Sequence, residues 1–249
     1  MNLFILTWCQ DEETLYGNLL TAQTLRIGFP TANVTVVDNA SIPSAREKIK
    51  QTYEREGCKF IQLDTEIPHH QFIGDVIAHY PGDNVAFLDP DLVFWGNMEE
   101  LDYPGLLNGR LIPNFYDNFT QTKTVERLHT SLIVIPDLAT LRAYLQKTRM
   151  HHFEAAYVAP TMIKMDGVWY RWDTMATMYG ELKDFCHVFG EELDMYDHLF
   201  CGSNFHFIKH KIGVQELEQV HEEVKNGNVF LLKGVHKAHD AYFLKHKWS

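Results

Sequence analysis

The stretch Val85–Asn97, with the sequence VAFLDPDLVFWGN, places two carboxylates between two apolar runs. Asp89 and Asp91 are two positions apart, so in an extended segment both side chains point the same way. Pro90 stiffens the turn between them. Two like charges this close are costly to bury unless a cation neutralises them, and carboxylate oxygens suit Mg²⁺ or Mn²⁺. The stretch therefore predicts a divalent-metal site at the end of a buried strand, although the same spacing also fits a solvated turn.

The first hundred residues alternate strand and helix patterns. The hydrophobic periodicity predicts strands at Leu3–Trp8, Asn33–Val37, Cys58–Leu63 and Val85–Leu88, and helices at Asp11–Ile27, Pro43–Glu56 and Phe72–Tyr80. This alternation predicts an α/β fold with a parallel sheet, in which ligands bind beyond the carboxyl ends of the strands. Three of the predicted strands end beside an acid, namely Asp38, Asp64 or Asp89.

The pattern changes after residue 98. We expect strands at Arg110–Phe115, Ser131–Ile135 and Val229–Leu232, helices at Asp137–Thr148, Asp173–Asp184 and Val214–Lys225, and irregular structure over Met150–Trp172. No internal repeat or flexible linker interrupts the chain. The sequence therefore predicts one domain over 1–249, in which 1–100 binds a nucleotide and 101–249 forms a second substrate site and a tail.

The charge balance restricts the partners. The chain of 249 residues has 22 Lys and Arg against 33 Asp and Glu, a net charge of −11. This disfavours a nucleic-acid backbone or a polybasic membrane contact as the main partner. Residues 228–249 invert the sign, with four Lys and three His against Asp240, so a polyanionic acceptor stays open. An acidic protein that handles an acidic substrate needs a divalent cation or such a basic patch.

Cysteine use and hydropathy indicate the compartment. The four cysteines lack CxxC spacing, which favours free thiols over a zinc site or a disulfide framework. No apolar run reaches the roughly 18 residues that a membrane helix needs. We therefore expect a cytoplasmic protein with no transmembrane segment.

The segment Val85–Asn97, together with Val36–Ser41, resembles GT-A fold glycosyltransferases of the D-x-D type. The resemblance implies a Rossmann-like, mostly parallel sheet flanked by helices, with a smaller C-terminal acceptor region. It implies that Asp91 coordinates Mn²⁺ or Mg²⁺ on a nucleotide-diphosphate sugar, and that Asp89 contacts the ribose or the metal. The same resemblance favours a UDP-sugar as donor, while the hydroxyl acceptor stays unidentified.

Further residues match parts of the same pattern. The resemblance places Thr7 and Trp8 beside the base and Asp38, with Asn39, beside the base or ribose. Thr130 and Ser131 are the corresponding candidates for the donor sugar. Each position also has an ordinary structural interpretation, as core, turn or strand entry.

The segment Trp169–Asp173 is the candidate acceptor site. Asp173 precedes a helical pattern, so it fits an N-cap. The resemblance to inverting members also makes it a general base, and the two roles are compatible. Trp169, Tyr170 and Trp172 are candidates for stacking on the acceptor, although aromatic residues at this density are more often core.

Two histidines compete as a third metal ligand. His198 lies in Asp197–Ser203, which resembles an element with His and Gly in some family members, and His236 lies in Gly234–Lys237, which resembles the glycogenin-like retaining branch. In that branch the neighbouring lysine, here Lys237, holds the diphosphate. The basic surroundings favour His236 over His198.

Three functions remain open at this point. The leading one is a metal-dependent glycosyltransferase, with inverting and retaining stereochemistry unresolved. A non-catalytic carbohydrate- or nucleotide-binding domain on the same fold is the alternative. A sugar-1-phosphate nucleotidyltransferase is disfavoured because Thr7–Glu13 contains no Gly, Lys or Arg.

Overall fold

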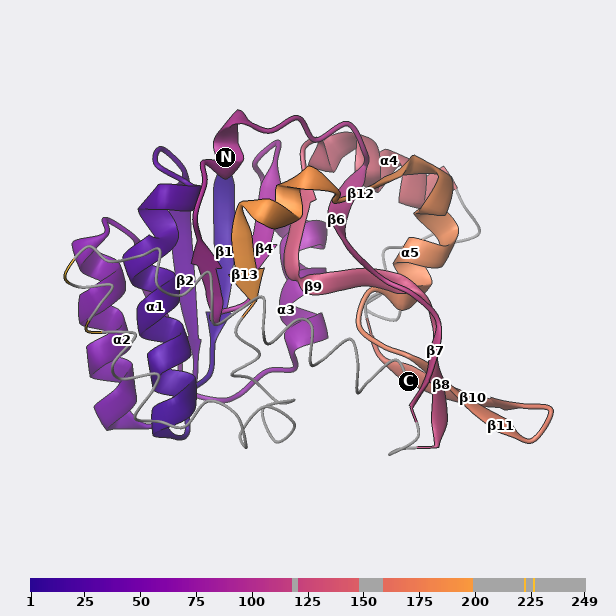
Figure 1. Cartoon of the computed structure of the whole chain (residues 1–249), viewed down its shortest axis with the longest axis horizontal. Helices are drawn as coiled ribbons and strands as arrows, with labels where there is room; N and C mark the ends of the chain where they lie inside the picture. The colour runs from indigo at the N-terminus through magenta and orange to yellow at the C-terminus, as the bar shows by residue number, and fades with distance from the viewer. Residues whose placement is uncertain (118–120, 148–158, 199–221, 223–225, 227–249) are drawn as a thin grey trace. The chain divides into compact units, whose positions relative to one another are not determined.

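The computed structural model describes residues 1–117, 121–147 and 159–198, together with Glu222 and Asn226 (Figure 1). The chain divides into two compact units. The first unit contains Met1–Glu66, Leu88–Leu101 and the described residues from Glu191 on. The second unit contains Ile67–Phe87 and Asp102–Gly190.

The first unit is built on three parallel strands in the order β1-β2-β3, with α1 and α2 packed side by side (Figure 1). A separate antiparallel pair joins β5 to β13. Its elements are β1 (Asn2–Thr7), α1 (Glu12–Gly28), β2 (Asn33–Asn39), α2 (Pro43–Arg55), β3 (Lys59–Leu63), β5 (Leu92–Phe94) and β13 (Tyr196–His198), with short 3-10 turns at Met98–Glu100 and Glu191–Asp194.

Local sequence explains where the helices of the first unit begin. At α1, the side chain of Asp11 accepts from the Thr14 N–H at 2.9 Å, and the hydroxyl of Thr14 accepts from the Asp11 N–H at 3.4 Å. This reciprocal capping box satisfies two backbone donors at the helix start. Pro43 occupies the first turn of α2, where its missing N–H has no cost.

The second unit contains a mixed sheet in the order β12-β6-β9-β4, in which β12 runs parallel and β9 antiparallel to β6. A smaller sheet has the order β10-β11-β8-β7. The elements are α3 (His69–His79), β4 (Val85–Leu88), β6 (Leu107–Ile112), β7 (Phe115–Asp117), β8 (Thr122–Thr124), β9 (Arg127–Ile135), α4 (Leu138–Lys147), β10 (Thr161–Met165), β11 (Val168–Trp172), α5 (Ala176–Leu182), a 3-10 turn at Lys183–Phe185 and β12 (Cys186–Val188).

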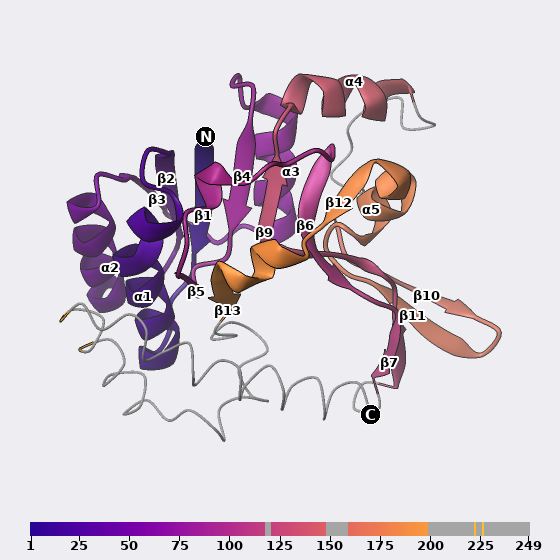
Figure 2. The ribbon, with the colours of Figure 1, turned by 45° about the horizontal axis from the view of Figure 1, so that its top comes forward.

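The hairpin β10–β11 corrects the expectation of irregular structure over Met150–Trp172 for its described part, whereas residues 150–158 lie outside the described residues. Its two-residue turn consists of Asp166 and Gly167, with φ of 50° and 81°. Both values lie in the left-handed region, which suits the turn that matches the twist of a hairpin. In both views the hairpin extends away from α5 and β9 of its own unit (Figures 1 and 2).

The α/β class is confirmed, and every helix and strand predicted within the first hundred residues is present. The later predictions need two further corrections. The helix expected from Asp173 begins at Ala176, because Met175 adopts a left-handed φ of 69° just before it. The strand expected over Arg110–Phe115 is replaced by β6 and β7. The helix and strand expected after residue 213 lie outside the described residues, apart from Glu222. Among the described helices, none is long and apolar enough to cross a membrane.

Candidate functional site

The acidic pair follows directly after a fully buried strand. All four residues of β4 are buried, as are all three of β5, so the chain between them has little freedom. Asp89 is half-buried, and Asp91 is only 5% exposed. A carboxylate this deeply buried requires a compensating partner.

That partner is a histidine from a distant part of the chain. His198 lies on β13, opposite Leu92 of β5 in the antiparallel register. Its Nε2 atom is 3.0 Å from Oδ1 of Asp91 and 3.9 Å from Oδ2 of Asp89. The structure thus brings together one of the two competing histidines with both acids, whereas His236 lies outside the described residues.

Three hydrogen bonds hold β13 and the residue before it against the segment that follows β5. The indole Nε1–H of Trp95 donates to Oδ2 of Asp197 at 2.8 Å. The backbone N–H groups of Trp95 and Gly96 both donate to the carbonyl of Met195, at 2.7 and 3.2 Å. A Cβ atom at Gly96 would meet Sδ of Met195, so a larger residue there would require the flexible Met195 side chain to move. Because His198 directly follows Asp197, these contacts also position His198 beside β5.

The three side chains fit a divalent cation. One ligand atom from each of Asp89, Asp91 and His198 lies within 4.8 Å of the others. Oδ1 of Asp91 is buried, and its 3.0 Å contact with Nε2 of His198 lacks the geometry of a hydrogen bond, so this oxygen accepts none within the described residues. Two carboxylate oxygens and an imidazole nitrogen suit Mn²⁺, and the carboxylates alone suit Mg²⁺. A buried acceptor facing two other potential ligands is the feature expected of a metal site.

Two buried groups of the first unit are uncharged. Complete burial raises the pKa of the Tyr53 phenol well above its usual value, and the nearby Cys58 and Asp91 act in the same direction. Burial likewise raises the pKa of the Cys58 thiol to about 11. Both groups are therefore neutral at physiological pH.

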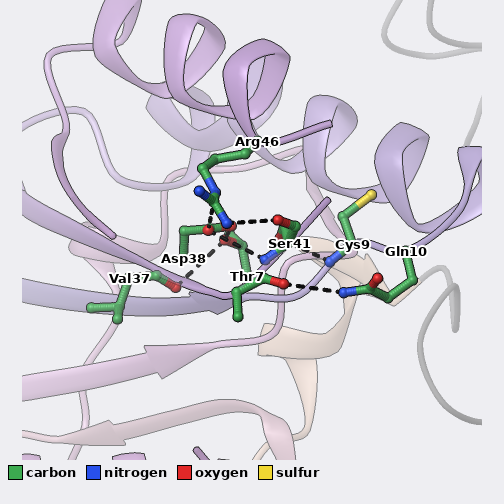
Figure 3. Close-up of polar contacts among 8 residues, drawn as sticks. Thr7, Cys9, Gln10, Val37, Asp38, Ser41 and Arg46 are labelled. Carbon is green, nitrogen blue, oxygen red and sulfur yellow. Dashed lines mark hydrogen bonds and ion pairs between the residues drawn. The ribbon is translucent and has the colours of Figure 1, made fainter. Parts of the chain in front are cut away.

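The carboxyl ends of β1 and β2 are linked by a polar network (Figure 3). Nε of Arg46 donates to Oδ2 of Asp38 at 2.9 Å, and its Nη2 donates to the Ser41 carbonyl at 2.7 Å. The Ser41 hydroxyl accepts from the Cys9 N–H at 2.9 Å, and the Gln10 side chain donates to the Ala40 carbonyl at 3.2 Å. The network ties the loop after β1 to the loop after β2.

The predicted nucleotide-binding residues differ in their exposure. Thr7 and Asp38 are completely buried, and Asn39 is 4% exposed. The hydroxyl of Thr7 lies 3.4 Å from Oδ1 of Asp38. These side chains hold the two strand ends in place, whereas Trp8 is 40% exposed beyond the end of β1 and offers an open aromatic face.

In the second unit, Asp173 is held by two arginines. Its Oδ2 accepts from Nη2 of Arg127 at 2.9 Å and lies 3.3 Å from Nη2 of Arg171, while its Oδ1 accepts from the Thr174 N–H at 2.9 Å. Burial lowers the pKa of Arg127 from its ordinary value, and the neighbouring carboxylate of Asp173 opposes that shift. Both oxygens of Asp173 therefore already have donors.

The predicted aromatic residues do not share one face. Alternation along β11 places Tyr170 and Trp172 on one face, with ring centroids 6.0 Å apart, and Trp169 on the other. In β9, Thr130 is half-buried and Ser131 is buried, and the N–H of Ser131 donates to Nδ1 of His129 at 3.0 Å.

Sequence reasoning missed three partners of predicted residues: Arg46, which pairs with Asp38, and Arg127 and Arg171, which pair with Asp173. It also missed the contact between Trp95 and Asp197. Trp95 and Asp197 flank the predicted ligands in sequence, so their proximity to Asp91 and His198 was the available signal. Nothing local pairs Arg46 with Asp38 or Arg127 with Asp173. The remaining candidate, Lys237, lies outside the described residues.

Comparison with solved structures identifies the fold. The bifunctional glycosyltransferase WbbM, in its apo form, is 12% identical, with a TM-score of 0.51 over 77% of this chain. This chain spans only 39% of the length of WbbM. Two further similar structures are a mannosyltransferase from Pyrobaculum calidifontis in complex with GDP-Man and Mn²⁺ (13% identity, 76% of this chain and 54% of that chain, TM-score 0.44) and the galactosyltransferase LgtC (9% identity, 77% and 74%, TM-score 0.41). No protein-family model and no curated protein matches the sequence. At this level of identity the likeness shows the fold alone, and that fold is the GT-A fold implied by the D-x-D segment.

Proposed function

We propose that this protein is a metal-dependent glycosyltransferase that transfers a sugar from a nucleotide-diphosphate donor to a hydroxyl acceptor. The observation that carries the proposal is the group formed by Asp89, Asp91 and His198 directly after a buried strand. The GT-A fold supports it, since in open α/β sheets the ligands bind beyond the carboxyl ends of the strands.

The reaction breaks the bond between the anomeric carbon and the diphosphate oxygen and forms a bond from that carbon to the acceptor oxygen. The acceptor hydroxyl loses its proton, and the nucleoside diphosphate leaves with the bonding electron pair. Asp89, Asp91 and His198 would hold Mn²⁺ or Mg²⁺, which when bound neutralises charge on the leaving diphosphate.

For the donor we propose a UDP-sugar, and Trp8 is the exposed aromatic residue that we propose contacts its base. Trp8 offers a face for stacking on the base, at the end of β1. For Thr7, Asp38 and Asn39 we propose a supporting role beneath the nucleotide. Arg46 holds Asp38 and the carbonyl of Ser41, so the ends of the two strands keep one arrangement. For the sugar and diphosphate we propose Thr130, Ser131 and Lys237.

For the acceptor we propose a hydroxyl compound that stacks on Tyr170 and Trp172, which share a face of β11. Asp173 directly follows β11 and is the candidate general base of an inverting reaction. A substrate hydroxyl would share its carboxylate with the Arg127, Arg171 and Thr174 donors. A retaining reaction needs no such base.

The test is thermal unfolding with UDP or UDP-sugars, with and without Mn²⁺. At a ligand concentration about 100 times Kd, binding stabilises the fold by about 2.7 kcal/mol, which raises the Tm of a chain this size by roughly 5–10 °C. We expect this rise only with Mn²⁺, and we expect Asp91→Asn and His198→Ala to abolish it.

Asp64→Asn is the matched control, because Asp64 is an exposed acid at the end of β3, and this variant should keep the Tm rise. His236→Ala tests the competing histidine and is expected to keep it too. If no nucleoside diphosphate stabilises the protein in the presence of Mn²⁺, the proposal is wrong. Stabilisation without any release of nucleoside diphosphate from the donor would instead assign a binding domain.

A further inference from the structure

The hairpin β10–β11 exposes an unusual concentration of large apolar side chains. Five of them are 38–52% exposed within eight residues: Met162, Ile163, Met165, Val168 and Trp169. The other exposed large hydrophobic residues of the described chain are scattered singly or in pairs over other elements. Single exposed apolar residues are ordinary, whereas a contiguous group marks an interaction site.

The apolar side chains lie on both faces of the hairpin. The cross-strand pair Met165–Val168 and the side chain of Ile163 lie on one face, whereas Met162 and Trp169 lie on the other. The hairpin also extends away from α5 and β9 (Figure 2). A protein or glycan with a flat contact surface would cover only one of these faces. A medium that surrounds the hairpin would cover both.

Two lysines lie over aromatic rings of the same sheet. Nζ of Lys164 lies 5.6 Å from the ring centroid of Trp169, and Nζ of Lys123 lies 5.4 Å from that of Tyr170. Arg171 of the same sheet lies 3.3 Å from Asp173, which leaves Lys123 and Lys164 as the positive charges, against Asp117 and Asp166. In a chain of net charge −11 this region is balanced and therefore less acidic than the average of the chain.

We infer that the β10–β11 hairpin docks the protein on an anionic lipid surface. Its apolar tip enters the boundary between headgroups and acyl chains, and Trp169 and Tyr170 lie at headgroup depth, where amphipathic rings are favoured. Lys123 and Lys164 extend their charges to the lipid phosphates. This inference shares Tyr170 with the proposed acceptor site, but its test measures vesicle binding and not sugar transfer.

Co-sedimentation with vesicles tests it, using phosphatidylcholine alone and phosphatidylcholine mixed with phosphatidylglycerol. The full chain is expected to bind only the mixed vesicles. Ile163→Ser combined with Trp169→Ser removes one apolar group from each face and should weaken binding tenfold or more. Lys123→Gln and Lys164→Gln should each weaken it about fivefold. Ile27→Ser, which changes an apolar residue 37% exposed on α1, is the matched control and should bind normally.

Asp166→Asn gives an opposite expectation. Asp166 is the acidic residue of the hairpin turn, and Asn tolerates the left-handed φ of 50° at this position. Removing the charge should strengthen binding to the mixed vesicles several-fold. A blue shift of Trp emission on adding these vesicles is a second readout. The shift should be smaller in Trp169→Phe, which keeps an aromatic ring at this position.

Three results would overturn the inference. The first is that the full chain binds neither kind of vesicle. The second is that the hairpin variants, with melting temperatures like that of the wild type, bind as strongly as it does. The third is a wild-type dimer that the Ile163→Ser and Trp169→Ser pair converts to a monomer, because a second copy would then occupy the hairpin.

Discussion

At the scale of single residues, Asp173 combines a proposed chemical role with an observed structural one. Its carboxylate is 23% exposed and pairs with Arg127, whose side chain is 12% exposed. Asp173→Asn should lower the free energy of unfolding by about 2 kcal/mol, less than the 3–5 kcal/mol typical of fully buried pairs. Urea denaturation measures this loss, and Asp184→Asn, at an exposed position in the same unit, should lose almost nothing.

A comparison with Arg127→Met distinguishes the chemical role of Asp173 from its structural role. That variant breaks the same ion pair but leaves the carboxylate in place. If Asp173 is the general base, kcat falls about 100-fold or more further in Asp173→Asn than in Arg127→Met. Equal losses of kcat in the two variants would restrict Asp173 to holding Arg127.

At the scale of elements, the start of α4 depends on one carboxylate. Asp137 accepts from the Thr140 N–H at 2.8 Å and from the Thr140 hydroxyl at 2.6 Å, and these bonds lower the pKa of Asp137 from its ordinary value. Asp137→Ala removes this N-cap and should cost about 1 kcal/mol of stability. Denaturation curves at neutral pH measure the difference.

The pH dependence follows from the direction of that shift. A carboxyl whose pKa is lowered by folding contributes stability above its unfolded-state value of about 3.9. The contribution disappears as the pH falls through the lowered pKa of the folded state. The stability difference between wild type and Asp137→Ala should therefore decrease in acid to the part that a neutral cap supplies. Asp137→Asn should keep that neutral part at every pH, and a difference between wild type and Asp137→Ala that does not change with pH would contradict this account.

The same elements show what the sequence could predict. The pattern Asp-x-x-Thr occurs at Asp11–Thr14 and Asp137–Thr140, and both predicted helix starts are confirmed because the capping contacts are local. Buried strands such as β4 were equally readable as apolar runs. The hairpin β10–β11 was missed because its side chains face outward, so no buried face imposes an alternating pattern.

The candidate site divides in the same way. The sequence analysis could single out Asp89 and Asp91 because both lie in one short segment. The choice between His198 and His236 depended on charge, a signal that favoured His236. The position of His198 depends instead on the pairing of β13 with β5, about a hundred residues earlier in the chain. Pairing between three-residue strands at that separation leaves no pattern in the sequence.

At the scale of the whole molecule, the net charge of −11 opposes an anionic donor. Two devices would overcome this repulsion: a metal at Asp89, Asp91 and His198, or the basic residues of 228–249. They predict different responses to salt. Long-range repulsion extends about 30 Å at 0.01 M ionic strength and about 10 Å at 0.1 M. A site that relies on the metal should repel UDP when the metal is removed.

We therefore predict that UDP binds weakly in EDTA, and that its affinity rises as the ionic strength increases from about 0.01 to 0.1 M. With Mn²⁺ the affinity should be far higher and should fall over the same range, because the added salt screens a local attraction. Isothermal titration calorimetry measures both trends, and uridine, which lacks the diphosphate, should show neither. Tight UDP binding in EDTA that weakens with salt would instead assign the diphosphate to the basic residues, because only a cationic patch produces that sign without a metal.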